Sequence, residues 1–188
     1  TNGKTTVSYL IEALFKEGKK SCGVIGTVNY RWNNTVIPAA QTTPSFVDNQ
    51  KFLSNLVQHH VPYCVMEVSS HALTQDRVYG IDFQEAVFTN LTSDHLDYHK
   101  TRESYFYAKA QLFTGLKPAS TAVINTDDIY GQQLLSMTEA KVITYGVKNQ
   151  ADVMAQDIQL NISGSRFTLA CEAGNVLIRT KLIGMHNI

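Results

Sequence analysis

The sequence predicts an α/β fold of the P-loop type, in which helices flank a mostly parallel sheet and a small antiparallel β region follows near the C-terminus. Through the first two-thirds of the 188 residues, amphipathic stretches alternate with short apolar runs. These runs are nearly continuous, as in strands that are buried on both faces of a parallel sheet. From Asp152 onward the pattern changes to near-alternation with turn signals, which is typical of antiparallel strands.

Helical periodicity predicts the helices of this fold. In the first of them, apolar residues recur at the i, i+3, i+4 spacing of an amphipathic helix, and Gly18 ends it. A second segment carries its apolar residues on one side in the same way. The predicted helices cover residues 5–16, 45–60, 102–114 and 129–137.

Short apolar runs between these helices predict buried strands. They cover residues 21–28, 63–68, 85–91, 120–126 and 141–146. Strands separated by helices indicate a parallel sheet that is covered on both faces. Residues 151–183, with turn signals at "SGS" and "EAGN", predict two or three antiparallel strands as a subregion of the same domain.

The composition excludes several classes of protein. With 44% hydrophobic and 17% charged residues, the chain is too apolar for a disordered protein. The 16 basic residues balance 16 acidic ones, so the basic excess of a nucleic-acid-coating protein is missing. The three cysteines lie far apart, which argues against a disulfide scaffold and fits a reducing compartment. Because the longest apolar run, residues 63–66, is far short of a membrane span, we expect a cytoplasmic globular domain without nucleic-acid or membrane partners.

The first residues match the end of a phosphate-binding loop. The segment "TNGKTT" opens the first predicted helix, where backbone N–H groups and the helix N-terminus hold phosphate oxygens in a P-loop. Lys4 would reach the β- and γ-phosphates, and the Thr5 hydroxyl would ligate Mg²⁺. The first glycine of the full motif would precede residue 1, so from this segment alone a plain loop with a helix cap is an equal alternative. We therefore expect the chain to be the middle piece of a longer protein.

Polar clusters follow two predicted strands, at the sheet edge where parallel α/β sheets bind ligands. Glu67 lies within "VMEV", where a carboxylate is costly to bury unless it meets a cation or a hydrogen-bond donor. Ser69 and Ser70 behind it are suited to capping the next helix. A second cluster, in residues 89–99, favours a metal or phosphate contact over a solvated loop because of its density. Its members are Asn90, Asp94, His95, Asp97 and His99.

Lys109 lies on the predicted helix of residues 102–114 among apolar neighbours at helical spacing. Those neighbours are Tyr105, Phe106, Leu112 and Phe113. A lysine in such a place is usually a snorkelling side chain, with its stem on apolar surface and its ammonium in water. The alternative is a neutral, desolvated amine that reacts with CO₂ or a carbonyl.

Taken in order, these motifs resemble those of the Mur ligases over nearly the whole chain. The matching segments are "TNGKTT", "TTP", "EVSSHAL", "TNLTSDHLDYH", "YAKAQLF", "NTDD" and "GMHN". The resemblance implies the family's central ATP-binding domain over residues 1–188, without its N-terminal UDP-binding and C-terminal amino-acid-binding domains. Within the family the set most resembles the branch that adds the third amino acid to UDP-MurNAc-dipeptide in peptidoglycan synthesis. That branch is an ATP-dependent amide ligase that works through an acyl phosphate, and the isolated piece is expected to be inactive.

The resemblance also implies roles for the matching positions. The ATP site would include Thr1, Asn2, Gly3, Lys4, Thr5, Thr6 and Asn187. Two Mg²⁺ ions would be held by Thr5, Glu67, His95 and Lys109, the last as a CO₂-derived carbamate. The UDP-MurNAc-peptide would contact Thr42, Thr43, Ser69, Gln75 and Arg77. Lys4, His95 and Lys109 would be catalytic, and the expected partners of this monomer are its small-molecule substrates.

Two other functions remain open at this stage. A ligase like folylpolyglutamate synthetase would keep the phosphate loop and the lysine, but it should not need "EVSSHAL" and "DHLDYH" as they stand here. A nucleotide-binding module without ligase chemistry would not need Glu67, His95 and Lys109 together. A dehydrogenase-type Rossmann domain is excluded because no GxGxxG follows a strand. The added amino acid, whether meso-diaminopimelate, lysine or another, is left open.

Overall fold

The computed structural model describes residues 1–92 and 94–188, which divide into two compact units. Unit 1 consists of Thr1–Gly3, Asp82–Asp94 and Ala110–Ile188. Unit 2 consists of Lys4–Ile81 and His95–Lys109. Within the described part of the chain, no helix is both long enough and apolar enough to cross a membrane.

The sheet of unit 2 has four strands in the order β3-β2-β1-β4. β1 (Cys22–Ile25) and β4 (Tyr63–Met66) pair in parallel, with Ile25 opposite Met66. β2 (Asn29–Trp32) and β3 (Thr35–Pro38) add an antiparallel hairpin to β1. The sequence did not predict this hairpin. The strand expected over residues 21–28 ends at Ile25. The residues that follow it turn toward the side chain of Glu67, directly after β4, and do not continue the strand pairing.

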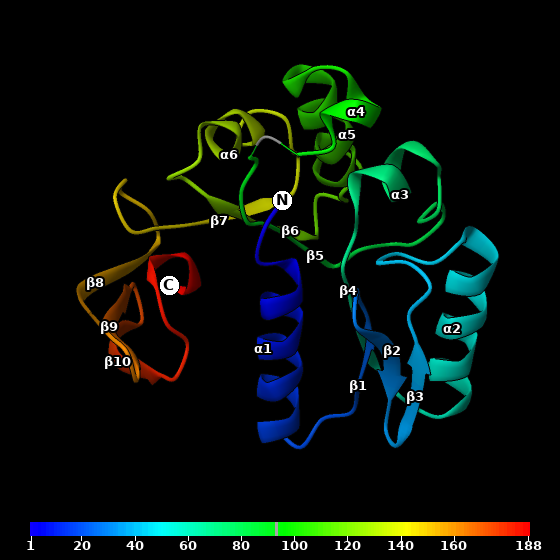
Figure 1. The fold of residues 1–188 in the computed structure, drawn as a ribbon, viewed down its shortest axis with the longest axis horizontal. Coiled ribbons are helices and arrows are strands. Elements are labelled where there is room, and N and C mark those ends of the chain that lie inside the picture. The colour runs from blue at the N-terminus through cyan, green and yellow to red at the C-terminus, as the bar shows by residue number, and fades with distance from the viewer. Residues whose placement is uncertain (93) are drawn as a thin grey trace. The chain divides into compact units, whose positions relative to one another are not determined.

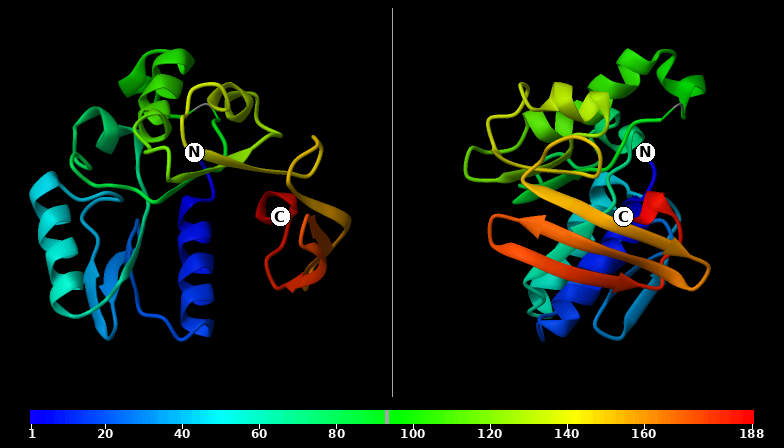
Figure 2. Two further views of the ribbon diagram at one scale, coloured as in Figure 1. Left: turned by 180° about the vertical axis from the view of Figure 1, so that it is seen from behind. Right: turned by 90° about the vertical axis from the view of Figure 1, so that its left-hand side faces the viewer.

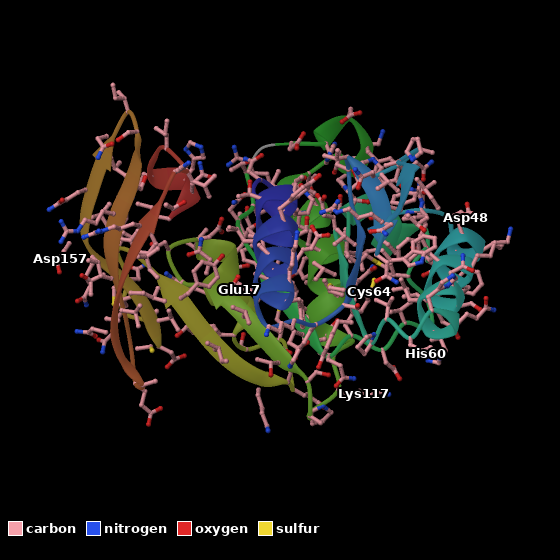
Figure 3. The ribbon with its side chains drawn as sticks, turned by 90° about the horizontal axis from the view of Figure 1, so that it is seen from below. Glu17, Asp48, His60, Cys64, Lys117 and Asp157 are labelled. Carbon is pink, nitrogen blue, oxygen red and sulfur yellow. The ribbon has the colours of Figure 1, made fainter. Side chains whose placement is uncertain are left out.

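Helices cover both faces of this sheet. α1 (Lys4–Glu17) packs against β1 and β4, and α2 (Phe46–Gln58) lies along the opposite face (Figure 1). Ser45 caps α2, since its hydroxyl accepts the N–H of Asp48 at 3.2 Å. Figure 3 shows Asp48 and His60 near the two ends of α2. The predictions of helices over residues 5–16 and 45–60 are confirmed.

The core of unit 2 forms where α2 meets the strands. Its buried members are Ile25, Tyr30, Trp32, Phe52, Leu56 and Val61. The ring of Phe52 stands edge-on to Trp32 at 5.2 Å and to Tyr30 at 6.3 Å between centroids. α2 is therefore attached to the hairpin by an aromatic contact that its amphipathic pattern alone did not specify.

Shorter helices complete unit 2. α3 (Ser70–Thr74) follows β4, and α4 (Leu96–His99) precedes α5. α5 (Arg102–Thr114) has the bounds that the sequence predicted, and it belongs to unit 2 as far as Lys109.

Unit 1 contains a six-stranded sheet in the order β10-β9-β8-β7-β6-β5. The parallel strands are β5 (Glu85–Phe88), β6 (Thr121–Asn125), β7 (Lys141–Gly146) and β8 (Val153–Asn161). β9 (Gly164–Cys171) and β10 (Gly174–Thr180) continue from β8 in antiparallel pairing (Figure 2). The predicted mostly parallel sheet with an antiparallel region near the C-terminus is confirmed.

The described part of unit 1 also contains α6 (Ile129–Leu134) and one 3₁₀ turn. α6 is shorter than the expected span of residues 129–137, and Asp128 caps it by accepting the N–H of Tyr130 at 2.9 Å. A single 3₁₀ turn, η1 (Met185–Asn187), follows β10.

Replacing Phe52 by alanine tests the contact between α2 and the hairpin. Phe52 is 5% exposed, and we expect Phe52→Ala to lower the free energy of unfolding by about 3–5 kcal/mol, because it leaves a cavity against Trp32. Trp32 is the only tryptophan of the chain, so its fluorescence follows unfolding of this unit in denaturant. As a control, Val57→Ala on the same helix, where the side chain is 74% exposed, should change stability by less than about 0.5 kcal/mol. Equal effects of the two substitutions would contradict this account of the core.

Candidate active site

Glu67 follows β4 directly, and its carboxylate is buried with three hydrogen-bond donors. The residue is 3% exposed. The Thr5 hydroxyl donates to Oε2 at 2.7 Å, while the backbone N–H of Thr27 donates to Oε1 at 2.9 Å and the Thr27 hydroxyl to Oε2 at 3.1 Å. A carboxylate buried in this apolar run was expected to need a cation or a donor, and the structure supplies donors.

Gly26 makes room for this carboxylate. A Cβ at residue 26 would lie 2.3 Å from Oε1 of Glu67, so any larger residue would displace the carboxylate or the strand end. Neither Gly26 nor Thr27 was predicted as a site residue from the sequence. The signal that could have found them is a Gly-Thr pair directly after a buried strand, at the sheet edge that also carries Glu67.

The pair formed by Thr5 and Glu67 fits a Mg²⁺ ion. It brings a hydroxyl and a carboxylate oxygen, the ligand types that Mg²⁺ prefers, to 2.7 Å from each other at the start of α1. Among residues 1–92 and 94–188, no three His, Cys, Asp or Glu side chains converge on a metal position. Mg²⁺ usually takes one or two carboxylates from the protein and fills its remaining positions with water and substrate phosphates. The metal roles of these residues stay a prediction.

The first residues of the chain are held within unit 1 by Asn90. The side-chain amide of Asn90 accepts the N–H of Asn2 at 2.9 Å and donates to the Asn2 carbonyl at 3.1 Å. Gly3 adopts φ = +84°, a conformation that favours glycine. Asn90 thus pairs with the backbone of the predicted phosphate loop, and its expected contact with a metal or phosphate stays a prediction. The ATP roles predicted for Thr1 to Thr6 are not decided by these contacts.

A second group of polar side chains surrounds Tyr105 of α5. The His95 ring lies edge-on at 6.0 Å, the His99 ring stacks at 5.0 Å, and Nζ of Lys109 lies 4.9 Å from the ring centroid. Lys109 is only 8% exposed, so it is not a snorkelling lysine with its ammonium in water. The structure therefore brings two of the predicted catalytic residues, His95 and Lys109, to one aromatic ring.

His99 connects this group to α3. Its Nε2 lies 2.8 Å from the hydroxyl oxygen of Ser70. Burial lowers the pKa of the His99 imidazole below its usual value, and the nearby side chains of His71, His95 and Lys109 lower it further. A neutral imidazole has one acceptor nitrogen, so His99 is suited to accept the Ser70 hydroxyl and fix its direction.

The "TTP" segment is anchored on the residues that follow β4. Thr43 is fully buried, and its hydroxyl donates to the carbonyl of Glu67 at 2.7 Å and accepts the N–H of Ser69 at 3.0 Å. The hydroxyl oxygen of Thr42 lies 3.1 Å from that of Thr27. The predicted substrate residues Thr42, Thr43 and Ser69 thus adjoin the residues that hold the Glu67 carboxylate.

Arg77 joins the same segment to the turn after α3. Its Nη1 donates to the carbonyl of Thr43 at 3.0 Å and to Oε1 of Gln41, and its Nε donates to Oε1 of Gln75 at 2.9 Å. The five predicted substrate residues therefore lie together within unit 2. Asn187, predicted to lie beside adenine, is in η1 of unit 1, where its side chain donates to the Ile183 carbonyl at 2.9 Å.

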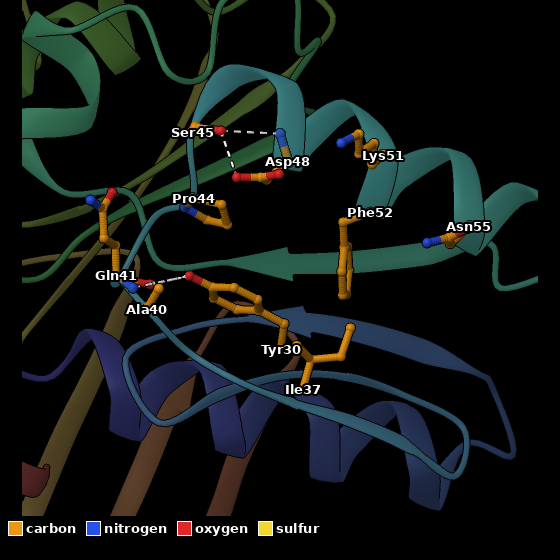
Figure 4. A pocket seen from close by; sticks show the side chains of 10 residues that line it. All are labelled: Tyr30, Ile37, Ala40, Gln41, Pro44, Ser45, Asp48, Lys51, Phe52 and Asn55. Atoms are coloured by element: carbon orange, nitrogen blue, oxygen red, sulfur yellow. Dashed lines mark hydrogen bonds between the residues drawn. The ribbon is translucent and has the colours of Figure 1, made fainter.

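A cavity of about 330 Å³ opens beside the "TTP" segment (Figure 4). The sequence did not predict it, because the hairpin that supplies one wall was itself not predicted. The Tyr30 hydroxyl donates to the carbonyl of Gln41 within the wall. The lining residues are Tyr30, Ile37, Ala40, Gln41, Pro44, Ser45, Asp48, Lys51, Phe52 and Asn55.

The sequence and the fold match a known family. The family model of the Mur ligase middle domain matches residues 1–188, and the chain therefore belongs to the Mur ligase middle-domain family. A relative from Geobacter metallireducens, named UDP-N-acetylmuramoyl-L-alanyl-D-glutamate–2,6-diaminopimelate ligase, is 45% identical over 100% of this chain and 38% of its own length. A solved structure of a ligase with the same name superposes with a TM-score of 0.89 at 34% identity, covering 100% of this chain and 39% of that one.

A likeness to folylpolyglutamate synthetase extends to the fold alone. The structure described as an FPGS–AMPPCP complex has a TM-score of 0.71 at 16% identity, over 100% of this chain and 53% of that one. The chain spans about two-fifths of the length of the curated relatives it matches.

Replacing Gly26 by alanine tests the arrangement around Glu67. The added Cβ would displace the carboxylate, so we expect Gly26→Ala to weaken Mg²⁺-dependent ATP binding by about 10–100-fold, as is usual when a residue that orients a metal ligand is changed. Calorimetric titration of the full-length protein with ATP, with and without Mg²⁺, measures this. Gly18→Ala is the matched control, since a Cβ there would meet Leu14 and Phe15 at an ordinary 3.4 Å. Unchanged Mg²⁺-dependent binding in Gly26→Ala would refute the proposed geometry.

Proposed function

We propose that this chain is the ATP-binding middle domain of an amide ligase that adds the third amino acid to UDP-MurNAc-dipeptide in bacterial peptidoglycan synthesis. The observation that carries the proposal is that, in one unit of a Mur ligase middle domain, Thr5 bonds the buried carboxylate of Glu67, and the buried Lys109 and the exposed His95 both lie against the ring of Tyr105. The 45% identity to a ligase named for this dipeptide supports it. We expect the protein to act in the cytoplasm as a monomer on small-molecule substrates.

The nucleotide half of the site is assigned to the start of the chain. Thr1 to Thr6 would form the end of the ATP-phosphate loop, with Lys4 directed to the β- and γ-phosphates and Asn187 beside the adenine. Thr5 and Glu67 would hold one Mg²⁺ with oxygen ligands. Bound Mg²⁺ would offset the negative charge of the oxygens that meet when a carboxylate approaches ATP. The buried position of Glu67 supports this role, because three hydrogen-bond donors fix the orientation of its carboxylate.

Lys109 is assigned as a carbamate. Its neutral amine would attack CO₂, forming an N–C bond and releasing one proton, which leaves an anionic carbamate. The buried position of Lys109 beside the Tyr105 ring, which His95 also contacts, supports this assignment. With Glu67 and His95, the carbamate would hold a second Mg²⁺.

The reaction follows from these groups in two steps. The terminal carboxylate of the dipeptide attacks the γ-phosphorus of ATP, so that an acyl phosphate forms and ADP leaves. The incoming amine then attacks the acyl carbon, phosphate leaves through a tetrahedral intermediate, and the amine loses a proton as the amide forms. Proper orientation of the dipeptide carboxylate is the task assigned to its binding residues. These are Thr42, Thr43, Ser69, Gln75 and Arg77.

ATP turnover by the full-length protein tests the proposed function. UDP-MurNAc-dipeptide is supplied with one candidate amino acid at a time, and 2,6-diaminopimelate is tried first because the relatives are named for it. We expect phosphate release that needs both the UDP-sugar dipeptide and one particular amino acid. Turnover only with a folate and glutamate would favour the folylpolyglutamate alternative, and ATP binding without turnover would favour a non-catalytic module.

Lys109 variants test the carbamate. We expect Lys109→Arg to lower turnover by about 100-fold or more, because the arginine side chain does not form the anionic ligand. In ¹³C-bicarbonate, the wild-type protein should show a carbamate carbon signal by NMR that this variant lacks. Lys117→Arg is the control, since the Lys117 side chain is 62% exposed and pairs with Asp82 of the same unit at 2.6 Å. A signal that persists in Lys109→Arg would exclude Lys109 as the modified residue.

A further inference from the structure

α2 carries a buried asparagine that the proposed function does not use. Asn49 is 0% exposed, and its Nδ2 donates to the carbonyl of Pro44 at 3.2 Å and to the carbonyl of Arg77 at 2.8 Å. The first carbonyl belongs to the "TTP" segment, and the second belongs to the turn after α3. A single amide group therefore joins two segments that are distant in the sequence.

Both segments carry residues that are proposed to contact the substrate. Thr42 and Thr43 lie on the first, and Gln75 and Arg77 lie on the second. The Arg77 guanidinium also bridges the segments, through the carbonyl of Thr43. That bridge depends on a side chain that the substrate would engage. The bonds from Asn49 go to backbone carbonyls, so they hold the main-chain spacing whichever partner the guanidinium takes.

The side-chain oxygen of Asn49 lowers the stability of the fold. Its Oδ1 is buried without a hydrogen-bond partner among residues 1–92 and 94–188. A buried acceptor without a partner lowers stability by about as much as one hydrogen bond contributes to it. Leucine has a similar size and would fill the same space without the orphaned oxygen. The two bonds to carbonyls are thus what asparagine adds at this position.

We propose that Asn49 is a positioning residue that sets the spacing between residues 42–44 and residues 75–77, and thereby the affinity for UDP-MurNAc-dipeptide. The inference rests on the proposed function, because it takes these two segments as the substrate-binding ones. Asn49 acts through the backbone carbonyls of Pro44 and Arg77, and within the described part of the chain its side chain makes no hydrogen bond to Thr5 or Glu67. Replacing Asn49 should therefore weaken the binding of the dipeptide and leave the binding of ATP unchanged.

Asn49→Leu in the full-length protein separates this role from a structural one. We expect the KM for UDP-MurNAc-dipeptide to rise about tenfold, as the loss of two hydrogen bonds to backbone would give. The KM for ATP and kcat should stay within about twofold. The midpoint of thermal unfolding should fall only slightly, because leucine removes the unpaired Oδ1 but leaves the carbonyls of Pro44 and Arg77 without this donor. Asn55→Leu is the matched control, because it makes the same chemical change on α2 at a residue whose side chain does not bond either segment.

Two results would overturn the proposal. In the first, both KM values stay at the wild-type level. In the second, the unfolding midpoint falls and the KM values for the dipeptide and for ATP rise together, which is the signature of a general structural role.

Hydrogen–deuterium exchange distinguishes failure of this inference from failure of the proposed function. Without any substrate, Asn49→Leu should speed amide exchange about tenfold at residues 41–43 and 75–77, because the hydrogen bonds from Asn49 to both segments are lost. If the wild-type protein does not use UDP-MurNAc-dipeptide, the proposed function fails whatever the exchange shows. Unchanged exchange in Asn49→Leu would overturn the positioning role even in an active ligase.

Discussion

Unit 2 is organised around the burial of one carboxylate, that of Glu67. The parallel pairing of β1 with β4 continues one step further, where the Glu67 N–H donates to the Ile25 carbonyl at 2.8 Å. This register brings the residues after β1 next to the Glu67 side chain, and so Gly26 must lack a Cβ and Thr27 has its N–H directed to the carboxylate. α1 is tied to the same point through Thr5. The buried carboxylate of Glu67, although it is costly to bury, thus holds α1 and the residues after β1 at the end of β4.

The backbone of Glu67 makes a second connection, to the segment proposed to bind substrate. The carbonyl of Glu67 accepts the hydroxyl of Thr43, while its side chain accepts that of Thr5. The two halves of the proposed site, one for nucleotide and one for the UDP-sugar dipeptide, are therefore held by one residue. A shift in the strand end would move both, which suits a reaction that needs a phosphorus atom and a carboxylate oxygen in line.

The sequence predicted what local pattern controls. Arg102–Thr114 and Lys141–Gly146 were predicted with their observed bounds, because their periodicity and flanking turn residues are local. Glu67 was identified because a charge within an apolar run is visible in one segment. The hairpin of β2 and β3 was missed although its partner strand β1 directly precedes it, and only its core contact with Phe52 of α2 comes from a more distant segment.

The missed site residues are recognised only by their contacts with other segments of the chain. A glycine after a strand is common. Gly26 is required here only because the side chain of Glu67 lies where its Cβ would be. Asn49 looks like an ordinary polar residue in the first turns of an amphipathic helix, and its burial depends on two carbonyls from other segments. Residue type and spacing mark groups that carry charge, but they do not mark neutral residues whose part is to position others.

Buried polar side chains divide unevenly between the units. In the part of unit 1 that the structure describes, they are the hydroxyl residues Thr1, Ser120, Thr126 and Ser165. Unit 2 buries Glu67, Lys109, His99 and Asn49 as well, each of which lowers stability unless its partners compensate. Natural sequences depart from an apolar interior mainly where function requires it. Glu67 lies at the end of β4, and Lys109 and His99 lie around Tyr105, which are the places where the proposed function puts its metal ligands. The burial pattern therefore supports that proposal independently of any resemblance between motifs.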